Sequence, residues 1–250
     1  MADDFVLGRG KVFCRGCGGT ELFSALDLGQ LPIANELWAN EYEIPENFPL
    51  QLRICTSCGL GQVEDVVTPS RLFRDYRYLS SISASFIEHA RKYVVSAVET
   101  LQINQTDWVL EVASNDGYLL QHFVDMGIRV LGVEPAENVA KIAVEAGVPT
   151  ISEFFGVEVA KSIVAKMGHP RLVIANNVMA HVPDLQDFVA GLAEIAGPHT
   201  IISVENPSLM NFLDDDQFDT IYHEHFSYLT AFSVDKIADR FGLKLINVEK

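Results

Sequence analysis

The sequence predicts an α/β domain with a parallel sheet, preceded by a small cysteine-bearing domain. From about residue 82, helix-length stretches with periodic apolar positions alternate with short runs rich in valine and isoleucine. This alternation is typical of a parallel sheet covered by helices on both faces. The first 68 residues hold all four cysteines but only short apolar runs, so little regular core can form there without a disulfide or metal cross-link. We therefore expect two domains, residues 1–68 and 69–250.

The second domain alternates strands and helices in order. Strands are expected at residues 106–114, 128–135, 148–152, 171–177, 199–206 and 243–250. Helices are expected at residues 81–101, 117–127, 135–147, 156–168, 184–197 and 233–242. The last strand runs into the final residue, which leaves an open sheet edge. We expect this domain to be incomplete at its C-terminal end, and a further segment or a second chain to complete the sheet.

The charge balance argues against several classes of partner. Among 250 residues, 34 are acidic and 18 are basic, and the net charge of −16 repels nucleic acids and anionic membrane surfaces. The N-terminus has no basic segment followed by an apolar one, and no stretch reaches the roughly 18 apolar residues that a membrane span needs. We expect a cytoplasmic protein that binds neither nucleic acid nor membrane.

The four cysteines form two matched pairs. Cys14 and Cys17 lie in Cys-Arg-Gly-Cys-Gly, and Cys55 and Cys58 lie in Cys-Thr-Ser-Cys-Gly. Two thiolates from each pair suit a tetrahedral zinc site, and the glycine after each second cysteine lets the backbone turn toward the metal. Because four thiolates leave no open coordination position, the zinc is predicted to be structural. Unrelated buried or redox cysteines and an iron–sulfur cluster are the alternatives.

A polar loop follows the first predicted strand, at the sheet edge where open α/β sheets bind their ligands. The glycine spacing of a dinucleotide site is missing, because Ala113 and Asn115 stand where glycines are expected. The loop instead presents the polar residues Glu111, Ser114, Asn115 and Asp116, and it ends at Gly117. Glu134 ends the second strand, about 20 residues further on, where a carboxylate accepts hydrogen bonds from ribose hydroxyls. An adenosyl ligand without phosphates fits better than NAD; an ordinary strand–helix turn is the alternative.

A second polar constellation lies at residues 219–228, Asp-Thr-Ile-Tyr-His-Glu-His-Phe-Ser-Tyr. Two histidines, a glutamate and two tyrosines within seven residues offer a base with orienting partners, and His181 follows the fourth strand and could join them. A metal site of His223, Glu224 and His225 is the weaker alternative, because side chains two residues apart point the same way only on a strand. A solvated loop is the other alternative.

Taken in order, these motifs resemble one family. The similarity runs over essentially the whole chain, through the two cysteine pairs and residues 76–81, 111–117, 132–135, 175–182 and 222–228. Its most specific element is Tyr-His-Glu-His-Phe-Ser-Tyr at 222–228. The chain resembles the zinc-containing sugar C-methyltransferases, which use S-adenosylmethionine to methylate C-3 of dTDP-4-keto-deoxysugars in antibiotic biosynthesis.

The resemblance implies a fold. Members of the family join a zinc-bearing N-terminal domain to a class I methyltransferase (Rossmann-like) sheet and then to a C-terminal α/β domain that helps hold the nucleotide. This chain ends at Lys250, before the last antiparallel strand of the central sheet and the C-terminal domain. We expect it to lack the C-terminal part of the family architecture.

The resemblance also implies roles for the polar side chains. His225 is expected to be the base that removes the C-3 proton, with Glu224 as a carboxylate near it. Three further side chains are expected to position the sugar or stabilise the enolate: Tyr222, Tyr76 and His181. The substrate is expected to be a dTDP-linked keto-deoxysugar.

Cofactor contacts follow from the same resemblance. Residues 111–117 are expected to line the methionine end of S-adenosylmethionine, Glu134 the ribose, and Phe154 with Phe155 the adenine by stacking. Pro135 is expected to be a further cofactor contact. Asn177 is expected to orient substrate or cofactor. The helix start near Ser80, Ser81 and Ser85 offers backbone amides to the methionine carboxylate. For the two phenylalanines, plain core packing is the alternative.

Two rival functions come from other classes. One is a zinc-ribbon interaction protein whose α/β domain binds S-adenosylmethionine without catalysis. The other is an NAD-dependent oxidoreductase on a similar sheet, which the missing glycine spacing disfavours.

Overall fold

The computed structural model of the chain describes residues 12–35, 45–64, 67–73 and 78–249. They form two compact units. One unit takes in the chain up to Leu72 together with 179–189 and the segment from Asn206 onward, and the other takes in 73–178 and 190–205. We call them the N-terminal unit and the sheet unit. None of the helices formed by these residues has the length and apolar character that crossing a membrane requires.

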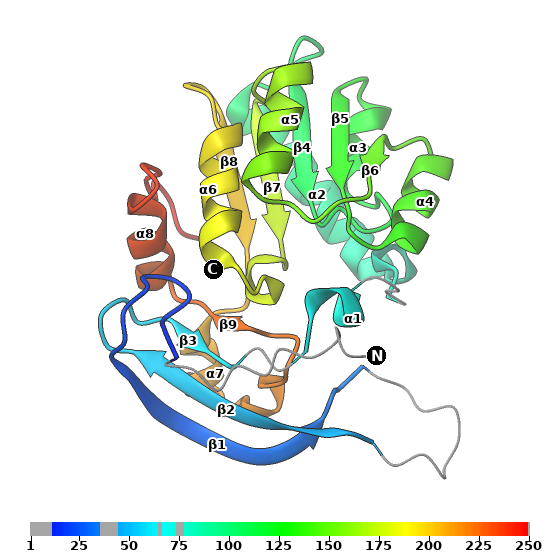
Figure 1. Cartoon of the computed structure of the whole chain (residues 1–250). Helices are drawn as coiled ribbons and strands as arrows, with labels where there is room; N and C mark the ends of the chain where they lie inside the picture. Colours follow the sequence, from blue (N-terminus) through cyan, green and yellow to red (C-terminus); the bar gives the residue numbers. More distant parts are fainter. Residues whose placement is uncertain (1–11, 36–44, 65–66, 74–77, 250) are drawn as a thin grey trace. The chain divides into compact units, whose positions relative to one another are not determined.

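The sheet unit is built on five parallel strands in the order β6-β5-β4-β7-β8 (Figure 1). The strands are β4 (Trp108–Val112), β5 (Arg129–Val133), β6 (Thr150–Ile151), β7 (Leu172–Asn176) and β8 (Ile201–Glu205). All five residues of β4 are buried, which fits its run of apolar side chains interrupted only by Glu111. The strand order reverses between β4 and β7, so the carboxyl ends of these strands mark the place where ligands bind in open α/β sheets.

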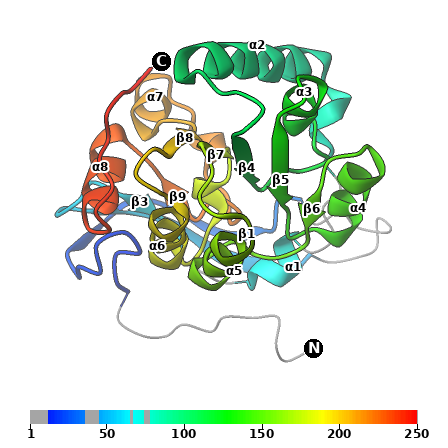
Figure 2. The same cartoon turned by 90° about the horizontal axis from the view of Figure 1, so that it is seen from above.

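Helices cover both faces of this sheet. They are α2 (Ala84–Leu101), α3 (Leu120–Asp125), α4 (Glu137–Glu145), α5 (Val157–Met167) and α6 (Leu185–Ile195), of which the last belongs to the sheet unit from residue 190 onward. A view along the sheet places α2 and α3 on one face and α5 on the other (Figure 2). The core between sheet and helices includes Val94, Val109, Phe123 and Ile174, all fully buried. The predicted parallel α/β sheet is therefore confirmed.

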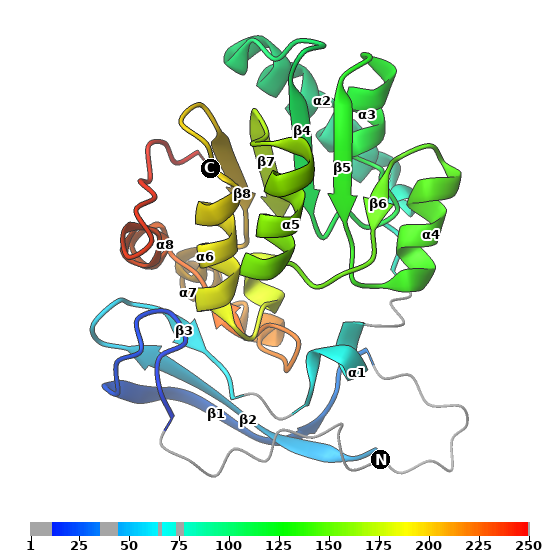
Figure 3. The ribbon, with the colours of Figure 1, turned by 45° about the horizontal axis from the view of Figure 1, so that its top comes forward.

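The N-terminal unit contains a second, antiparallel sheet. Its order is β1-β2-β3-β9, with β1 (Leu22–Pro32), β2 (Asn47–Cys55), β3 (Gly61–Gln62) and β9 (Ser227–Tyr228). β1 and β2 form a long antiparallel pair (Figure 3). The register of this pair shifts after Ser24 and after Asp27. The other elements assigned at least in part to this unit are α1 (Pro69–Phe73), η2 (Met179–His181), α7 (Leu209–Asp214), η3 (Phe218–Thr220) and α8 (Ala231–Asp239).

The N-terminal unit has a core of its own. Leu50, Leu52 and Val63 pack with Leu209 and Tyr228 in one apolar cluster. Leu209 and Tyr228 come from the last third of the chain. The strand pair β3 and β9 likewise joins an N-terminal segment to a segment from the last third of the chain. The short apolar runs of the first 68 residues therefore build more regular structure than the sequence predicts, because a later segment completes their core.

The two units differ from the two contiguous domains expected at 1–68 and 69–250. The segments 179–189 and 206–249 group with the N-terminal residues, and the physical reason is the shared sheet and core just described. A second difference concerns the end of the chain. Residues 243–249 form no strand, so the strand predicted there is wrong. Their side chains are largely exposed, Ile246 to 75%, whereas the predicted strand needed a sheet to bury them.

Candidate functional site

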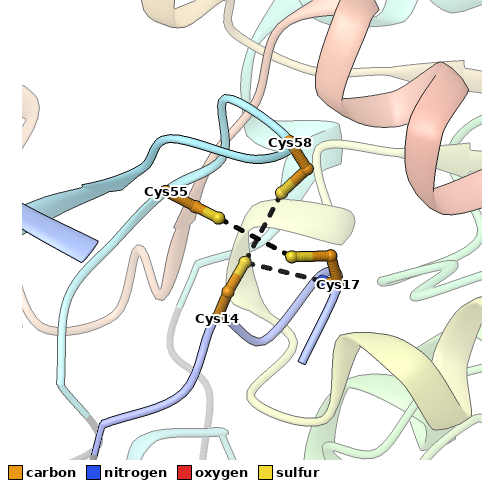
Figure 4. A group of neighbouring side chains, drawn as sticks. All are labelled: Cys14, Cys17, Cys55 and Cys58. Atoms are coloured by element: carbon orange, nitrogen blue, oxygen red, sulfur yellow. Dashed lines mark hydrogen bonds between the residues drawn. The ribbon is translucent and has the colours of Figure 1, made fainter. Parts of the chain in front are cut away.

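The four cysteines come together in the N-terminal unit. Figure 4 shows the four sulfur atoms turned toward a common centre, and all lie within 4.8 Å of one another. The Sγ atoms of Cys14 and Cys58 are 3.5 Å apart, and those of Cys17 and Cys55 are 3.6 Å apart. Zn–S bonds of ~2.3 Å in a tetrahedron place sulfur atoms ~3.8 Å apart, close to these spacings. A disulfide needs about 2.05 Å, so all four cysteines are free thiols here.

Two matching turns build this cluster. The amide of Gly18 donates to the carbonyl of Cys14, and the amide of Gly59 donates to the carbonyl of Cys55. Gly18 and Gly59 have φ of 73° and 70°, a backbone conformation that glycine adopts without strain. The structure thus gives both glycines the turning role that the sequence predicts, and the donor set of four thiolates suits zinc.

The loop after β4 has an unusual backbone. Ala113 and Asn115 have φ of 56° and 50°, and Gly117 has φ of 81°. Left-handed conformations cost an L-residue roughly 1–2 kcal/mol, which is why glycines often stand at such positions. The two residues that replace the expected glycines thus keep a glycine-like backbone. This strain is concentrated at the ligand-binding edge of the sheet, where functional sites commonly hold it.

Glu134 holds this loop in place. One of its carboxylate oxygens accepts from the amide of Asn115 at 2.9 Å, and the other accepts from the amide of Ala136, also at 2.9 Å. The side chain is 5% exposed, and burial raises its pKa despite these two donors. Each oxygen retains a second acceptor position, so ribose hydroxyls could still bind there.

Glu111 and Asp116 add two more buried carboxylates to the same edge of the sheet. Burial raises the pKa of Glu111 well above its usual value, and the negative charges of Glu134 and Asp116 raise it further. One carboxylate oxygen of Glu111, one of Asp116 and the hydroxyl of Ser114 are buried without a hydrogen-bond partner. Buried acceptors of this kind fit a positively charged ligand, and S-adenosylmethionine carries a sulfonium and an ammonium group.

The segment before α2 contacts the same loop. The amide of Ser80 donates to Oδ1 of Asn115 at 2.9 Å, and the amide of Ser81 donates to Oδ2 of Asp116 at 3.2 Å. α2 itself begins at Ala84, and its N-cap Ser83 accepts from the amide of Phe86. The amides of Ser80 and Ser81 were expected to bind a methionine carboxylate. In this structure they instead hold the side chains of Asn115 and Asp116.

Phe154 lies between β6 and α5 and is 46% exposed. The alternative of plain core packing is therefore wrong for this side chain, and an exposed ring can stack on an adenine. Pro135 follows Glu134 directly, on the connection from β5 to α4. Both residues thus follow strands of the sheet at their carboxyl ends.

Asn177 directly follows β7 and has a φ of 53°. Its amide donates to the carbonyl of Glu205 at 2.7 Å, and its side chain donates to a carboxylate oxygen of Glu205 at 3.2 Å. The other carboxylate oxygen of Glu205 contacts Nε2 of His89 at 2.9 Å. Asn177 is therefore oriented by β8 and α2, a pairing that the sequence did not reveal.

His225 has a defined tautomer in the N-terminal unit. Its Nδ1 lies 3.0 Å from the carbonyl oxygen of Thr220, which can only accept, so Nδ1 carries the hydrogen. Nε2 then has a lone pair, and the hydroxyl of Tyr222 lies 2.8 Å from it. Burial lowers the pKa of His225, which keeps the ring neutral near pH 7. A neutral imidazole with a defined basic nitrogen is the form that a general base requires.

His181 and Glu224 lie next to this pair. The rings of His181 and His225 are 4.7 Å apart, edge to face, and Nδ1 of His181 donates to the backbone carbonyl of Glu224 at 3.0 Å. Burial, followed by the charge of His225, lowers the pKa of His181 to about 4. The carboxylate of Glu224 accepts from the backbone amide and the side-chain amide of Asn35, and burial raises its pKa.

His223 has a different environment from His225. Its Nε2 donates to the carbonyl of Pro49 at 3.3 Å, its ring packs edge-on against Phe48, and it is 2% exposed. Within the described part of the chain, the four cysteines are the group of histidine, cysteine and acidic side chains that could hold a metal. The alternative metal site of His223, Glu224 and His225 therefore has no support in the geometry.

The structure thus brings the predicted residues together in three groups. The cysteine group lies in the N-terminal unit, as does the histidine group of His181, Tyr222, Glu224 and His225, and the predicted cofactor residues lie in the sheet unit. Tyr76 lies outside the described residues. Asn35 and the carbonyl of Thr220 were missed, because neither a loop asparagine far away in sequence nor a backbone carbonyl gives a sequence signal.

Comparison with known proteins identifies both parts of the chain. A family model described as "Putative zinc binding domain" matches residues 14–73, and one described as "Methyltransferase domain" matches residues 86–248. C-methyltransferase NovU of Streptomyces niveus is 37% identical over 237 residues, covering 94% of this chain and 56% of that protein. The chain therefore spans little more than half the length of this curated relative.

Solved structures include methyltransferases that resemble part of the chain. A SAM-dependent methyltransferase from Archaeoglobus fulgidus is 18% identical, with 62% of this chain and 68% of that chain covered and a TM-score of 0.49. A SAM-dependent methyltransferase from Anabaena variabilis is 16% identical, with 58% and 68% covered and a TM-score of 0.46. Because the methyltransferase-domain model matches well over half of the residues, the chain belongs to the methyltransferase-domain family and has the class I methyltransferase fold.

Proposed function

We propose that the chain is a C-methyltransferase that uses S-adenosylmethionine to methylate the carbon next to the ketone, C-3, of a dTDP-4-keto-deoxysugar. The observation that carries this proposal is the neutral His225, whose Nδ1 is held by Thr220 and whose basic Nε2 faces the hydroxyl of Tyr222. The 37% identity to C-methyltransferase NovU supports methylation at carbon. The resemblance of residues 222–228 to the sugar C-methyltransferases supports the sugar substrate.

The chemistry assigns a task to each group of residues. A saturated sugar carbon is not nucleophilic, but a proton next to a ketone can be removed to leave an enolate. Nε2 of His225 takes this proton, and the resulting imidazolium keeps its hydrogen bond to the Thr220 carbonyl. The hydroxyl of Tyr222 is the available donor for the developing oxyanion. The neutral His181 ring, whose Nδ1 hydrogen is held by the Glu224 carbonyl, offers Nε2 as an acceptor that can position a sugar hydroxyl. The enolate carbon then attacks the methyl group in line, and S-adenosylhomocysteine leaves.

S-adenosylmethionine supplies the methyl group as a sulfonium electrophile. We propose that Glu111, Ser114 and Asp116 receive its positively charged methionine end, because their unpartnered buried atoms need such a ligand. Glu134 accepts the ribose hydroxyls and Phe154 stacks on the adenine. Zinc in the four-cysteine group is structural, since thiolates would occupy all four of its positions.

A methyl-transfer assay tests the proposal. The chain is incubated with S-adenosylmethionine and each member of a panel of dTDP- and UDP-linked sugars with and without a 4-keto group, and products are followed by mass spectrometry. We expect a mass gain of one methyl group with the dTDP-4-keto-deoxysugars, and NMR should place it at C-3. Binding of S-adenosylmethionine without turnover of any ketosugar would instead support a non-catalytic zinc-ribbon interaction protein.

A further inference from the structure

We propose that Arg15 is a positioning residue: it links the first cysteine turn to both chain segments that carry the two histidines. Arg15 lies between Cys14 and Cys17, so its backbone belongs to the metal-binding turn itself. Its amide donates to Oε1 of Gln62 at 2.8 Å. Gln62 is 3% exposed and donates in turn to the carbonyl of Phe13 at 3.0 Å. The side chain of Gln62 therefore holds the backbone from which the Arg15 side chain extends, at Arg15 itself and at Phe13.

The guanidinium of Arg15 reaches the segment that follows His181. Its Nη1 donates to the carbonyl of Pro183 at 2.7 Å. Pro183 lies two residues after His181, which ends the short helix η2. This bond spans 168 residues of sequence and holds η2 against the cysteine turn.

The same guanidinium also reaches the segment that carries His225. It lies 5.3 Å over the ring of Phe226, the residue next to His225. Its Nη2 donates to the carbonyl of Val63 at 2.8 Å, and the amide of Val63 donates to the carbonyl of Phe226 at 3.2 Å. One planar, permanently charged group thus fixes both segments whose histidine rings lie 4.7 Å apart.

Few other side chains could do this. A lysine offers one ammonium point on a flexible stem, which cannot donate to two carbonyls while covering an aromatic ring as a guanidinium does. The cysteine site therefore has two roles. It stabilises the N-terminal unit, and it fixes the backbone of Arg15, the residue that sets the spacing of His181 and His225. The inference rests on the proposed role of these histidines in catalysis, but its geometry is independent of any substrate.

The test compares Arg15→Gln and Arg15→Lys with the control Arg240→Gln. Arg240 also donates to this turn, from Nη1 to the carbonyl of Cys17 at 2.8 Å, but this bond ties the turn to α8 and not to a histidine segment. Zinc content and thermal melting establish that each variant retains its metal and its fold. The ¹⁵N chemical shifts of the His181 and His225 rings then report their tautomers and contacts without any substrate.

We expect Arg15→Gln to keep its zinc, to shift the ring signals of both histidines, and to lower kcat about 10–100-fold with S-adenosylmethionine affinity within twofold of wild type. Arg15→Lys should be intermediate, and Arg240→Gln should leave ring signals and kcat unchanged. Unaltered histidine signals in a zinc-loaded Arg15→Gln would overturn the proposal, as would equal changes in Arg240→Gln. If wild type shows no methyl transfer but the ring signals shift as expected, the proposed function fails and the positioning role stands.

Discussion

Glu111, near the carboxyl end of β4, lowers the stability of the folded protein but is suited to bind a cationic ligand. Glu111 is 2% exposed, and burial together with the charges of Glu134 and Asp116 raises its pKa. A buried glutamate with a raised pKa destabilises the folded protein once the pH exceeds its ordinary value of about 4.3. A cationic ligand removes this cost, which explains why such a residue lies at the proposed cofactor position.

The variant Glu111→Gln tests both effects. Because glutamine cannot ionise, the free energy of unfolding of the variant should exceed that of wild type increasingly as the pH rises from 4.5 to 7, by up to about 1.4 kcal/mol per pH unit. Affinity for S-adenosylmethionine should fall by about tenfold or more, since a charged acceptor contributes roughly 1.5–3 kcal/mol. Urea unfolding at both pH values and calorimetry measure the two effects. A stability difference that does not change with pH would show that Glu111 is not a strained carboxylate.

The pH dependence of turnover follows from the buried His225. Burial lowers its pKa below the ordinary value of about 6.5, and the neutral ring is the active base. As the pH falls, activity should therefore drop to half of its plateau value only below pH 6.5. The measurement is kcat from pH 5 to pH 8 with saturating substrates, with folding checked at each pH. A half-maximal activity above pH 6.5 would contradict the assignment of His225 as the base.

Which of these residues could be identified from sequence depends on the kind of signal they give. Glu134 and His225 could be proposed from the sequence because a carboxylate at a strand end, or an imidazole in a polar cluster, carries its chemistry in its own side chain. The carbonyl of Thr220 and the side chain of Asn35 act only through folded geometry: Asn35 meets Glu224 across 189 residues of sequence. Long-range partners of this kind are set by tertiary structure and leave no local pattern.

At the scale of elements, the connection from β4 to α3 holds two non-glycine residues with positive φ, Ala113 and Asn115. Ala113 adopts a φ of 56°, which costs an alanine roughly 1–2 kcal/mol and a glycine almost nothing. Ala113→Gly should therefore stabilise the protein by up to about 1 kcal/mol, after the larger entropy loss of glycine is subtracted. The control Ala160→Gly, inside helix α5, should destabilise by about 1 kcal/mol or more. Thermal melting measures both, and equal losses in the two variants would mean that Ala113 is unstrained.

Elements were predictable where their own side chains decide their structure. β4, β5, β7 and β8 have apolar runs long enough to be identified alone, and α2, α4 and α5 have clear helical periodicity. β3 and β9 have two residues each and are defined by their pairing with neighbouring strands, β3 with β2 and β9 and β9 with β3, so no local pattern could reveal them. Residues 243–249 have the alternation of a strand but no partner strand within the described part of the chain, and they remain irregular.

At the scale of the whole molecule, the N-terminal unit draws on both ends of the chain. α8 packs against the first cysteine turn, since a Cβ added at Gly16 would lie 2.8 Å from Cδ1 of Ile237. Loss of the metal should therefore affect the segment from Asn206 onward as well as the first 64 residues. An independent N-terminal domain would instead lose structure only within its own residues when the metal is lost.

Cys55→Ser tests this expectation by removing one thiolate ligand. We expect backbone amides of 206–241 to lose hydrogen-exchange protection together with those of 12–64, because they share one sheet and one core. Amides of 84–176 should stay protected. Hydrogen exchange read by mass spectrometry resolves these segments, and Ser57→Ala, within the second cysteine turn, is the control that keeps all four ligands. Loss confined to 12–64 would support a separate N-terminal domain instead.

Proton abstraction by His225 is the central claim, and deuterium exchange at the sugar carbon measures it directly. The dTDP-4-keto-deoxysugar is incubated in D₂O with S-adenosylhomocysteine in place of the methyl donor, so that only the first step can occur, and exchange at C-3 is followed by NMR. Wild type should incorporate deuterium at C-3. His225→Gln should exchange about 10²–10⁴-fold more slowly while binding S-adenosylhomocysteine with unchanged affinity. Equal exchange rates in the two proteins would contradict the claim and assign the base to another group.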